Sequence, residues 1–392
     1  MRVLLAYSGG LDTSYLLCRL VNEGHEVLAV TVDTGGLDDA EREAIATRAR
    51  AMGASEYRCV DARQRVFSQH IAWLIKANVR RGGVYPLCVG AERVVQAQVV
   101  AEQAKESGAD AVCHGSTGAG NDQIRFDVAI RTLLPGARLL TPIRDEGIQR
   151  ETSAAYLAEA GFPISAARKD YSINQGLWGV TIGGKETHEA WSYLPESVWP
   201  TTCTPARAPE GGEDVVLTFT QGNLQGGLDT VEALNALGAR HGVGRGMHLG
   251  DTILGIKGRI AFEAPAAAIL IDAHRELEKL VLTRLQLTQK EGLGATYGAL
   301  LHEGLYFDPV MRDLEAFLDS TQRNVTGDVR VHLEQGRVEV HGVRSAWSLM
   351  DARAGTYGEA NRLWSNQDAR GFSNVYGLQG VLAARVRPPE GS

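Results

Sequence analysis

The first fourteen residues constrain the fold most, because an apolar strand runs directly into a glycine-rich turn and the start of a helix. The strand Val3-Leu4-Leu5-Ala6 is followed, after one tyrosine, by Ser8-Gly9-Gly10-Leu11-Asp12-Thr13-Ser14. The two glycines permit positive φ and close backbone approach, and the serine and threonine hydroxyls add hydrogen-bond donors. A helix from about Thr13 to Asn22 would direct its positive N-terminal end into the turn. The pattern therefore predicts a phosphate-binding loop.

This turn differs from the two commonest nucleotide loops. It lacks the Gly-Lys-Ser/Thr of a Walker loop and the G-x-G-x-x-G of a dinucleotide turn. Ser-Gly-Gly-x-Asp-x-Ser instead resembles the pyrophosphate loop of enzymes that split ATP between its α and β phosphates. An ordinary strand-to-helix turn is the alternative, since it also favours Gly, Asp and Ser. The position at a strand end before a helix favours the phosphate loop.

Length and composition exclude several classes of protein. A chain of 392 residues exceeds the usual single core, so we expect two domains. The net charge of −7 argues against a nucleic-acid partner, and no apolar run approaches the roughly 18 residues that a membrane span needs. The five cysteines are scattered and form no C-x-x-C pair, which argues against a structural metal site. We expect a reducing, cytoplasmic location.

Strand and helix patterns alternate along residues 1–165, as in a parallel sheet with helices on both faces. The expected strands after the first one are 27–32, 57–60, 110–114 and 138–141. The expected helices after the first one are 39–52, 65–78, 92–107 and 152–160. The sequence thus predicts an α/β nucleotide-binding domain at 1–165.

The pattern changes beyond residue 165. Mixed loops are expected as far as residue 214, followed by strands at 215–219, 252–256 and 269–271, helices at 273–289, 297–301 and 310–320, and a hairpin of 329–333 with 336–343. The tail after residue 357 has too little apolar sequence for a core of its own. We therefore expect an α+β domain at 166–356 and a C-terminal oligomerisation arm at 357–392.

A second glycine-rich loop, Gly115 to Asp122, follows the strand expected at 110–114. Loops at the C-terminal ends of two strands of one parallel sheet would face the same crevice, where such sheets bind ligands. Thr117, Asn121 and Asp122 can hold the carboxylate and ammonium groups of an amino acid, and Arg125 can pair with a carboxylate. Taken alone, such a run also fits a mobile surface loop.

The two loops together carry a resemblance to a known family. Ala6-Tyr7-Ser8-Gly9-Gly10-Leu11-Asp12-Thr13-Ser14 and His114-Gly115-Ser116-Thr117-Gly118-Ala119-Gly120-Asn121-Asp122-Gln123-Ile124-Arg125-Phe126 resemble argininosuccinate synthetase. Weaker matches extend along most of the chain: Tyr85-Pro86-Leu87, Tyr171-Ser172-Ile173-Asn174, His241-Gly242-Val243-Gly244-Arg245, Gly255-Ile256-Lys257 and Val325-Thr326-Gly327. The resemblance implies an N-type ATP pyrophosphatase domain, similar to the adenine nucleotide α hydrolases, then an α+β synthetase domain and an arm exchanged in a homotetramer.

The resemblance also implies a reaction, the ATP-dependent ligation of citrulline and aspartate in arginine biosynthesis. The products are argininosuccinate, AMP and pyrophosphate, and the intermediate is a citrullyl-adenylate. ATP is expected with Mg²⁺, and the partners are the small-molecule substrates alone. Such chemistry depends mostly on alignment and charge stabilisation, and it needs few acid–base groups.

Residue roles follow from the resemblance. The nucleotide would be held by Ala6, Tyr7, Ser8, Gly9, Gly10, Leu11, Asp12, Thr13 and Ser14, with Val32 beside the adenine and Gly115 near the ribose and phosphates. Aspartate would be held by Thr117, Asn121 and Asp122, and citrulline by Tyr85, Asn121, Arg125, Ser172 and Thr181. Asp12, Asn121 and Arg125 are the candidate catalytic residues, and His114 is interpreted as a structural hydrogen-bond partner.

Three departures from the family pattern fall on the citrulline side. Gly90 stands where the family usually has a serine, Gly250 where it has a glutamate, and Phe262 where it has a tyrosine. In the favoured explanation Asp251, Arg93 or a shifted loop supplies the same hydrogen bonds. The alternative is an N-acylated citrulline, whose neutral amide would leave an acidic partner buried and unpaired.

Three rival functions have weaker support. A tRNA-thiolating enzyme would need paired reactive cysteines and a basic surface, and an amidotransferase-type synthetase would need a Cys-His site that releases ammonia. A nucleotide-binding regulator without turnover would bind ATP but release no pyrophosphate.

Overall fold

The first part of the chain forms a parallel sheet. The computed structural model describes residues 1–165, 170–351, 355–359 and 363–387. The strand order is β3-β2-β1-β4-β5, and every pairing is parallel. The strands are β1 (Arg2–Ala6), β2 (Glu26–Asp33), β3 (Glu56–Asp61), β4 (Ala111–Cys113) and β5 (Arg138–Leu140). The chain order reverses between β1 and β4, so the loops that follow these two strands open into one crevice.

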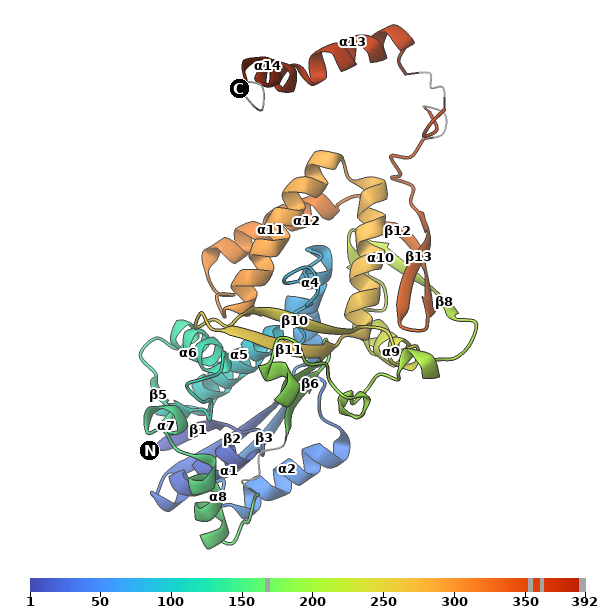
Figure 1. Ribbon diagram of the computed structural model, residues 1–392. Helices are drawn as coiled ribbons and strands as arrows, with labels where there is room; N and C mark the ends of the chain where they lie inside the picture. The colour runs from blue at the N-terminus through green and yellow to red at the C-terminus, as the bar shows by residue number, and fades with distance from the viewer. Residues whose placement is uncertain (166–169, 352–354, 360–362, 388–392) are drawn as a thin grey trace. The chain divides into compact units, whose positions relative to one another are not determined.

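Helices cover both faces of this sheet (Figure 1). One face carries α1 (Leu11–Asn22), α2 (Asp39–Ala51) and α8 (Arg150–Glu159), and the other carries α5 (Gly90–Ser107) and α6 (Asp122–Leu133). Alternate side chains of β1 enter the two layers, since Leu5 packs with Leu16 of α1 whereas Leu4 packs with Phe126 of α6. The expected α/β fold class is confirmed.

Two antiparallel sheets follow, in the orders β10-β11-β7-β6 and β13-β12-β8-β9. Their strands are β6 (Tyr171–Gly176), β7 (Gly179–Gly184), β8 (Glu213–Thr220), β9 (Asn223–Leu224), β10 (Arg245–Asp251), β11 (Lys257–Glu263), β12 (Gly327–Glu334) and β13 (Arg337–Arg344). The expected hairpin is present as β12 and β13. β6 and β7 lie where we expected loops, because glycine and polar residues hide the alternation of these strands.

The remaining elements are mostly helical. They are α3 (Arg63–Val66), the π-helical turn η1 (Phe67–Ile71), α4 (Ala72–Lys76), α7 (Pro142–Asp145), η2 (Lys185–His188), η3 (Glu196–Val198), η4 (Pro205–Arg207), α9 (Gly227–Arg240), α10 (Pro265–Val281), α11 (Arg284–His302) and α12 (Pro309–Gln322). No helix within the described ranges is long and apolar enough to cross a bilayer.

Two predicted strands are wrong. Residues 252–256 form the turn between β10 and β11, closed by a hydrogen bond from Thr252 N to Ile256 O of 2.8 Å. Ile269, Leu270 and Ile271 lie inside α10 and are fully buried. A short apolar run does not distinguish a core strand from a buried helix, and here the helix continues on both sides of the run.

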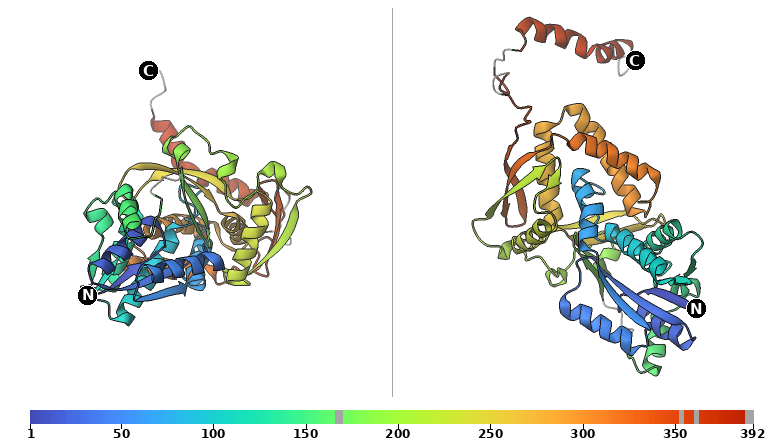
Figure 2. Two further views of the ribbon diagram at one scale, coloured as in Figure 1. Left: turned by 90° about the horizontal axis from the view of Figure 1, so that it is seen from below. Right: turned by 180° about the vertical axis from the view of Figure 1, so that it is seen from behind.

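One hydrophobic core joins the nucleotide-binding part to the later helices. Ile71, Leu74 and Ile75 pack in the same buried cluster as residues of α10 and α12. α4 lies beside α10 and α12, as the right-hand view of Figure 2 shows. Residues 1–347 accordingly form one compact unit.

Residues 348–392 form a second unit. Its described part contains α13 (Asn366–Tyr376) and α14 (Leu378–Val386), whose side chains Phe372, Tyr376 and Val381 are exposed. The domain boundaries expected near residues 165 and 356 stay predictions.

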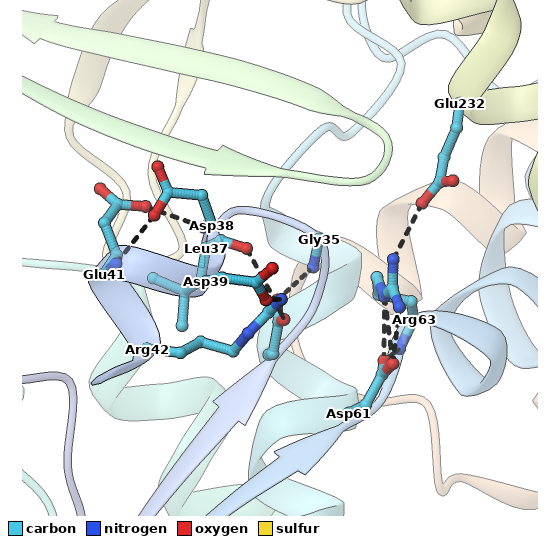
Figure 3. A network of polar contacts seen from close by, with 10 residues as sticks. Gly35, Leu37, Asp38, Asp39, Glu41, Arg42, Asp61, Arg63 and Glu232 are labelled. Carbon is cyan, nitrogen blue, oxygen red and sulfur yellow. Dashed lines mark hydrogen bonds and ion pairs between the residues drawn. The ribbon is translucent and has the colours of Figure 1, made fainter. Parts of the chain in front are cut away.

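A polar network adds a second link between the sheet and α9. Arg63 follows β3 and lies between Asp61 and Glu232 of α9 (Figure 3). Its Nη2 lies 2.8 Å from Asp61 Oδ2, and its Nη1 lies 3.3 Å from Glu232 Oε1. The carboxyl end of β3 is thereby linked to the later part of the chain.

A buried glutamate makes a third link. Thr34, after β2, donates its hydroxyl to Glu92 Oε2 at 3.0 Å, and Trp178 N, between β6 and β7, donates to Oε1 at 3.2 Å. Gly176 has to lack a side chain, because a Cβ there would lie 1.8 Å from Glu92 Oε2. Burial raises the pKa of Glu92 to about 8. The side chain is therefore largely protonated in the folded protein at neutral pH.

This raised pKa makes stability depend on pH with a defined sign. Between pH 4.5 and about 8 the folded state holds a proton that the unfolded state has lost, so the free energy of unfolding falls as the pH rises. Glu92→Gln mimics the protonated acid permanently. Relative to wild type, the variant should gain up to about 1.4 kcal/mol for each pH unit across this window.

Urea unfolding of wild type and Glu92→Gln at pH 5, 6.5 and 8 measures this difference. A difference in stability that stays constant over this range would contradict the assignment of a protonated Glu92.

Candidate active site

The first glycine-rich loop is held by its own hydroxyls. Ser8 Oγ lies 3.2 Å from Thr13 Oγ1 and accepts a hydrogen bond from Gly10 N at 3.4 Å. Gly9 has a φ of 72°, and a Cβ there would lie 2.9 Å from Cγ1 of Ile45. The loop therefore needs glycine at this position, and it leads directly into α1.

A cavity of about 440 Å³ opens beside this loop. Ala6, Tyr7, Ser8 and Val32, which were predicted to hold the nucleotide, are among its lining residues. The apolar part of its lining includes Val30, Val100 and Phe126. An apolar lining of this kind suits the flat base of a nucleotide, whose phosphates would then lie at the glycine-rich loop. We call this the nucleotide cavity.

The second loop meets the first at Gly115. A Cβ on Gly115 would lie 3.2 Å from Cγ2 of Thr13 and 3.6 Å from Cβ of Asp12. Burial raises the pKa of Asp12, and the charge of Arg150 opposes that shift. His114, at the start of this loop, hydrogen bonds Asp127 at 2.9 Å. That contact matches its interpretation as a structural partner.

A second cavity, of about 370 Å³, lies beyond this loop. Tyr85, Asn121, Asp122, Arg125 and Thr181, all predicted to hold substrate, are among its lining residues. We call it the substrate cavity. The two cavities share lining residues Arg93 and Asn174, so they adjoin.

Two arginines hold one carboxylate at this junction. Arg93 Nε donates to Asp122 Oδ2 at 3.0 Å, and Arg125 Nη1 donates to Oδ1 at 2.8 Å. Arg93 also donates to Asn174 Oδ1 at 3.0 Å, so it connects α5, α6 and β6. Burial opposes ionisation of Asp122, but the two guanidinium groups outweigh it and hold the pKa of this carboxyl below its usual value.

His302, at the end of α11, fixes Arg125 from the other side. Arg125 Nε donates to the carbonyl oxygen of His302 at 2.8 Å, and Nη2 lies 3.2 Å from its Nδ1. Burial, followed by the charge of Arg125, lowers the pKa of His302 to about 3. The ring is therefore neutral and accepts a hydrogen bond from the guanidinium.

Two predicted site residues lie apart from these contacts. Thr117 is exposed on the second loop, and Ser172 is exposed on β6. Neither is among the lining residues of the two cavities. The remaining loop residues, Gly9 to Ser14, form the turn and the first residues of α1. The binding roles of all these residues stay predictions.

Gly90 and Gly250 leave space for the side chains of Arg125 and His248, respectively. A Cβ at Gly90 would lie 3.3 Å from Arg125 Nη2 and 3.7 Å from His302 Nδ1. A Cβ at Gly250 would lie 2.5 Å from Nε2 of His248. The ring of Phe262 lies 5.3 Å from that of Tyr85. The space beside these two glycines in the substrate cavity is therefore occupied by neighbouring side chains.

Sequence reasoning assigned no role to Asn174, His248 or His302, and it named Arg93 solely as a possible substitute donor. Arg93 stands beside Glu92 in a helix whose neighbouring residues are largely buried, and a charged pair there was an available signal. No signal in the sequence places the two histidines at the cavity, because their partners are more than 100 residues away in the chain.

The parallel sheet with its glycine-rich loop and two adjoining cavities is the arrangement expected of an α/β nucleotide-binding enzyme. Comparison with known proteins narrows this class. Residues 2–163 match the family model described as arginosuccinate synthase N-terminal HUP domain, and residues 171–383 match that of the arginosuccinate synthase C-terminal domain.

Curated relatives agree along the whole chain. The argininosuccinate synthase of Pyrococcus furiosus is 37% identical over 98% of this chain and 94% of its own length. Those of Xanthomonas campestris and Synechococcus are each 38% identical, covering 98% and 100% of this chain and 98% and 99% of their own lengths. The chain belongs to the argininosuccinate synthase family.

The strained glycine of the first loop yields a prediction. Gly9→Ala should weaken ATP binding about tenfold, because its methyl group displaces Ile45 and shifts the loop. Gly24→Ala is the matched control, since Gly24 has a φ of 80° but open space around its Cβ position. Both variants should lose roughly 1 kcal/mol of stability from the positive φ.

Titration with a fluorescent ATP analogue, together with urea unfolding, separates the two effects. Equal ATP affinity in Gly9→Ala and Gly24→Ala would contradict the role of the loop.

Arg93 yields another prediction. Arg93→Lys keeps the charge but loses the guanidinium that reaches Asp122 and Asn174 together, so kcat/KM should fall at least about tenfold. Arg58→Lys is the control, because Arg58 is also partly buried and pairs with Glu56 at 2.6 Å on β3, outside both cavities. Steady-state kinetics of both variants measure this difference. An equal loss of kcat/KM in Arg93→Lys and Arg58→Lys would contradict the role of Arg93.

Proposed function

We propose that this chain joins citrulline to aspartate at the expense of ATP and releases argininosuccinate, AMP and pyrophosphate. The observation that carries the proposal is the junction of the two cavities at Arg93 and Asn174. A nucleotide in one cavity and a ureido compound in the other would meet there. Family membership along the whole chain supports the same reaction.

The reaction proceeds in two steps in this proposal. The ureido oxygen of citrulline attacks the α-phosphorus of ATP, an O–P bond forms, and the bond to pyrophosphate breaks. The amine of aspartate then attacks the activated ureido carbon, loses a proton, and expels AMP. Arg93 and Arg125 lie beside this junction, where they stabilise negative charge on the reacting groups.

The remaining groups bind and orient. The amides and hydroxyls of Ser8 to Ser14 hold the nucleotide phosphates, and Thr117, Asn121 and Asp122 hold aspartate. Asn121 already accepts a hydrogen bond from Ile253 N at 2.9 Å, which connects the second loop to the β10–β11 turn. A substrate bound to Asn121 would thus affect both the second loop and the β10–β11 turn.

Mg²⁺ is part of the proposal. Oxygen atoms of the kind that Mg²⁺ prefers are present at the loop: Asp12 stands in the first turn of α1, and the hydroxyls of Ser8 and Thr13 lie 3.2 Å from each other. When bound, the ion would neutralise charge on the phosphates. A cytoplasmic location and a homotetramer complete the proposal.

Free citrulline is the proposed ureido substrate. The relatives are argininosuccinate synthases, whose product is formed from free citrulline, and this favours it over an N-acylated citrulline. The departures at Gly90 and Gly250 are then replacements within the site, since neutral histidines stand beside both positions.

Pyrophosphate release by the purified protein tests the proposal. With Mg-ATP, pyrophosphate release should require citrulline, and release beyond one turnover should also require aspartate, because aspartate is needed to expel AMP and free the site. N-Acetylcitrulline is the matched comparison and should react far more slowly. No release with either ureido compound would contradict the enzyme assignment, and a preference for the acylated compound would contradict the substrate.

A further inference from the structure

His248 is enclosed in the substrate cavity by residues that leave room for its ring. It lies on β10, and its imidazole stacks on the ring of Tyr85 with centroids 5.6 Å apart and an angle of 15°. A Cβ at Gly82 would lie 2.8 Å from its Cε1, and a Cβ at Gly250 would lie 2.5 Å from its Nε2. Two glycines and an aromatic face therefore define one slot for this side chain.

The carboxylates of the same cavity are already engaged. The acidic residues among its lining are Asp122 and Asp251, and both lie in the described part of the chain. Asp122 is held by two arginines, and Asp251 pairs with Lys257 at 2.7 Å. A substrate ammonium group that enters the cavity needs another acceptor, and an imidazole nitrogen is one.

The imidazole is suited to accept such a bond. Burial, followed by the charge of Arg81, lowers the pKa of His248. The ring is therefore neutral at physiological pH and carries a free lone pair on one nitrogen.

Arg81, in the lining of the same cavity, has a guanidinium nitrogen that could bind a ligand carboxylate. Its Nη2 donates to the carbonyl oxygen of Asp251 at 2.8 Å. Its Nη1 is buried and has no hydrogen-bond partner within the described residues. A buried, unsatisfied donor on a guanidinium is costly, and a ligand carboxylate would satisfy it.

The chemistry orients the substrate. The ureido oxygen has to reach the α-phosphate, so the ureido end occupies the junction at Arg93 and Asn174, which the two cavities share. The amino-acid end is then left to residues that line the substrate cavity alone. His248 and Arg81 are two of these.

We propose that His248 and Arg81 form the subsite for the amino-acid end of the ureido substrate, in which His248 accepts a hydrogen bond from the α-ammonium group and Arg81 pairs with the α-carboxylate. This inference rests on the proposed function. It makes His248 a specificity-determining residue, which selects a ureido amino acid over a ureido acid without the amino group.

The test compares citrulline with desamino-citrulline in wild type, His248→Phe and His248→Gln. Phenylalanine keeps the stack on Tyr85 but removes the acceptor, whereas glutamine restores an acceptor. Wild type should prefer citrulline in kcat/KM, and His248→Phe should lose about tenfold of this preference through KM. His248→Gln should recover part of it. His188→Phe, at an exposed position on η2, is the control and should behave as wild type.

Arg81 is tested in the same way with citrullinamide, which lacks the α-carboxylate charge. Arg81→Met should reduce the preference for citrulline over citrullinamide about tenfold and leave the preference over desamino-citrulline nearly unchanged. The two variants thus report on different ends of one amino acid.

The outcomes distinguish a failure of the subsite assignment from a failure of the proposed function. If wild type releases no pyrophosphate with citrulline and aspartate, the proposed function fails. If wild type is active but His248→Phe slows citrulline and desamino-citrulline equally, the subsite assignment alone is wrong.

Discussion

The structure depends on one shared carboxylate, Asp122, held between Arg93 and Arg125. Two guanidinium groups around one carboxylate leave a net positive charge at the place where the nucleotide and substrate cavities adjoin. In a partly desolvated site such charges are already oriented when negative charge develops, and they need no reorganisation during the reaction. Together with the hydrogen bond from Arg93 to Asn174, these ion pairs connect α5, α6 and β6.

Glycine positions determine which side chains fit into the substrate cavity. Gly90, Gly82 and Gly250 each leave space that a neighbouring histidine or arginine fills. The imidazoles of His248 and His302, whose pKa values burial lowers, add no further charge to a cavity whose lining already includes several arginines. Gly176 follows the same principle in the core, where it leaves room for the buried carboxyl group of Glu92. Close packing therefore determines which polar groups can serve the site.

The sequence predicted the nucleotide-binding half well, because its signals are local. Buried apolar runs that end in glycine-rich loops specify both the parallel strands and the edge of the sheet at which Gly115 lies beside Thr13. The second half was harder to predict. The run Ile269 to Ile271 belongs to a helix, and β6 and β7 consist largely of polar and glycine residues. His248 and His302 reach the cavity through long-range packing, which leaves no local pattern in the sequence.

The central claim is that the ureido oxygen meets the α-phosphate at the junction beside Arg93. Citrulline labelled with oxygen-18 in its ureido group tests this most directly. The label should appear in the phosphate of AMP when ATP and aspartate are present, because the O–P bond formed in the first step persists when AMP leaves. Unlabelled AMP, formed together with argininosuccinate, would contradict it.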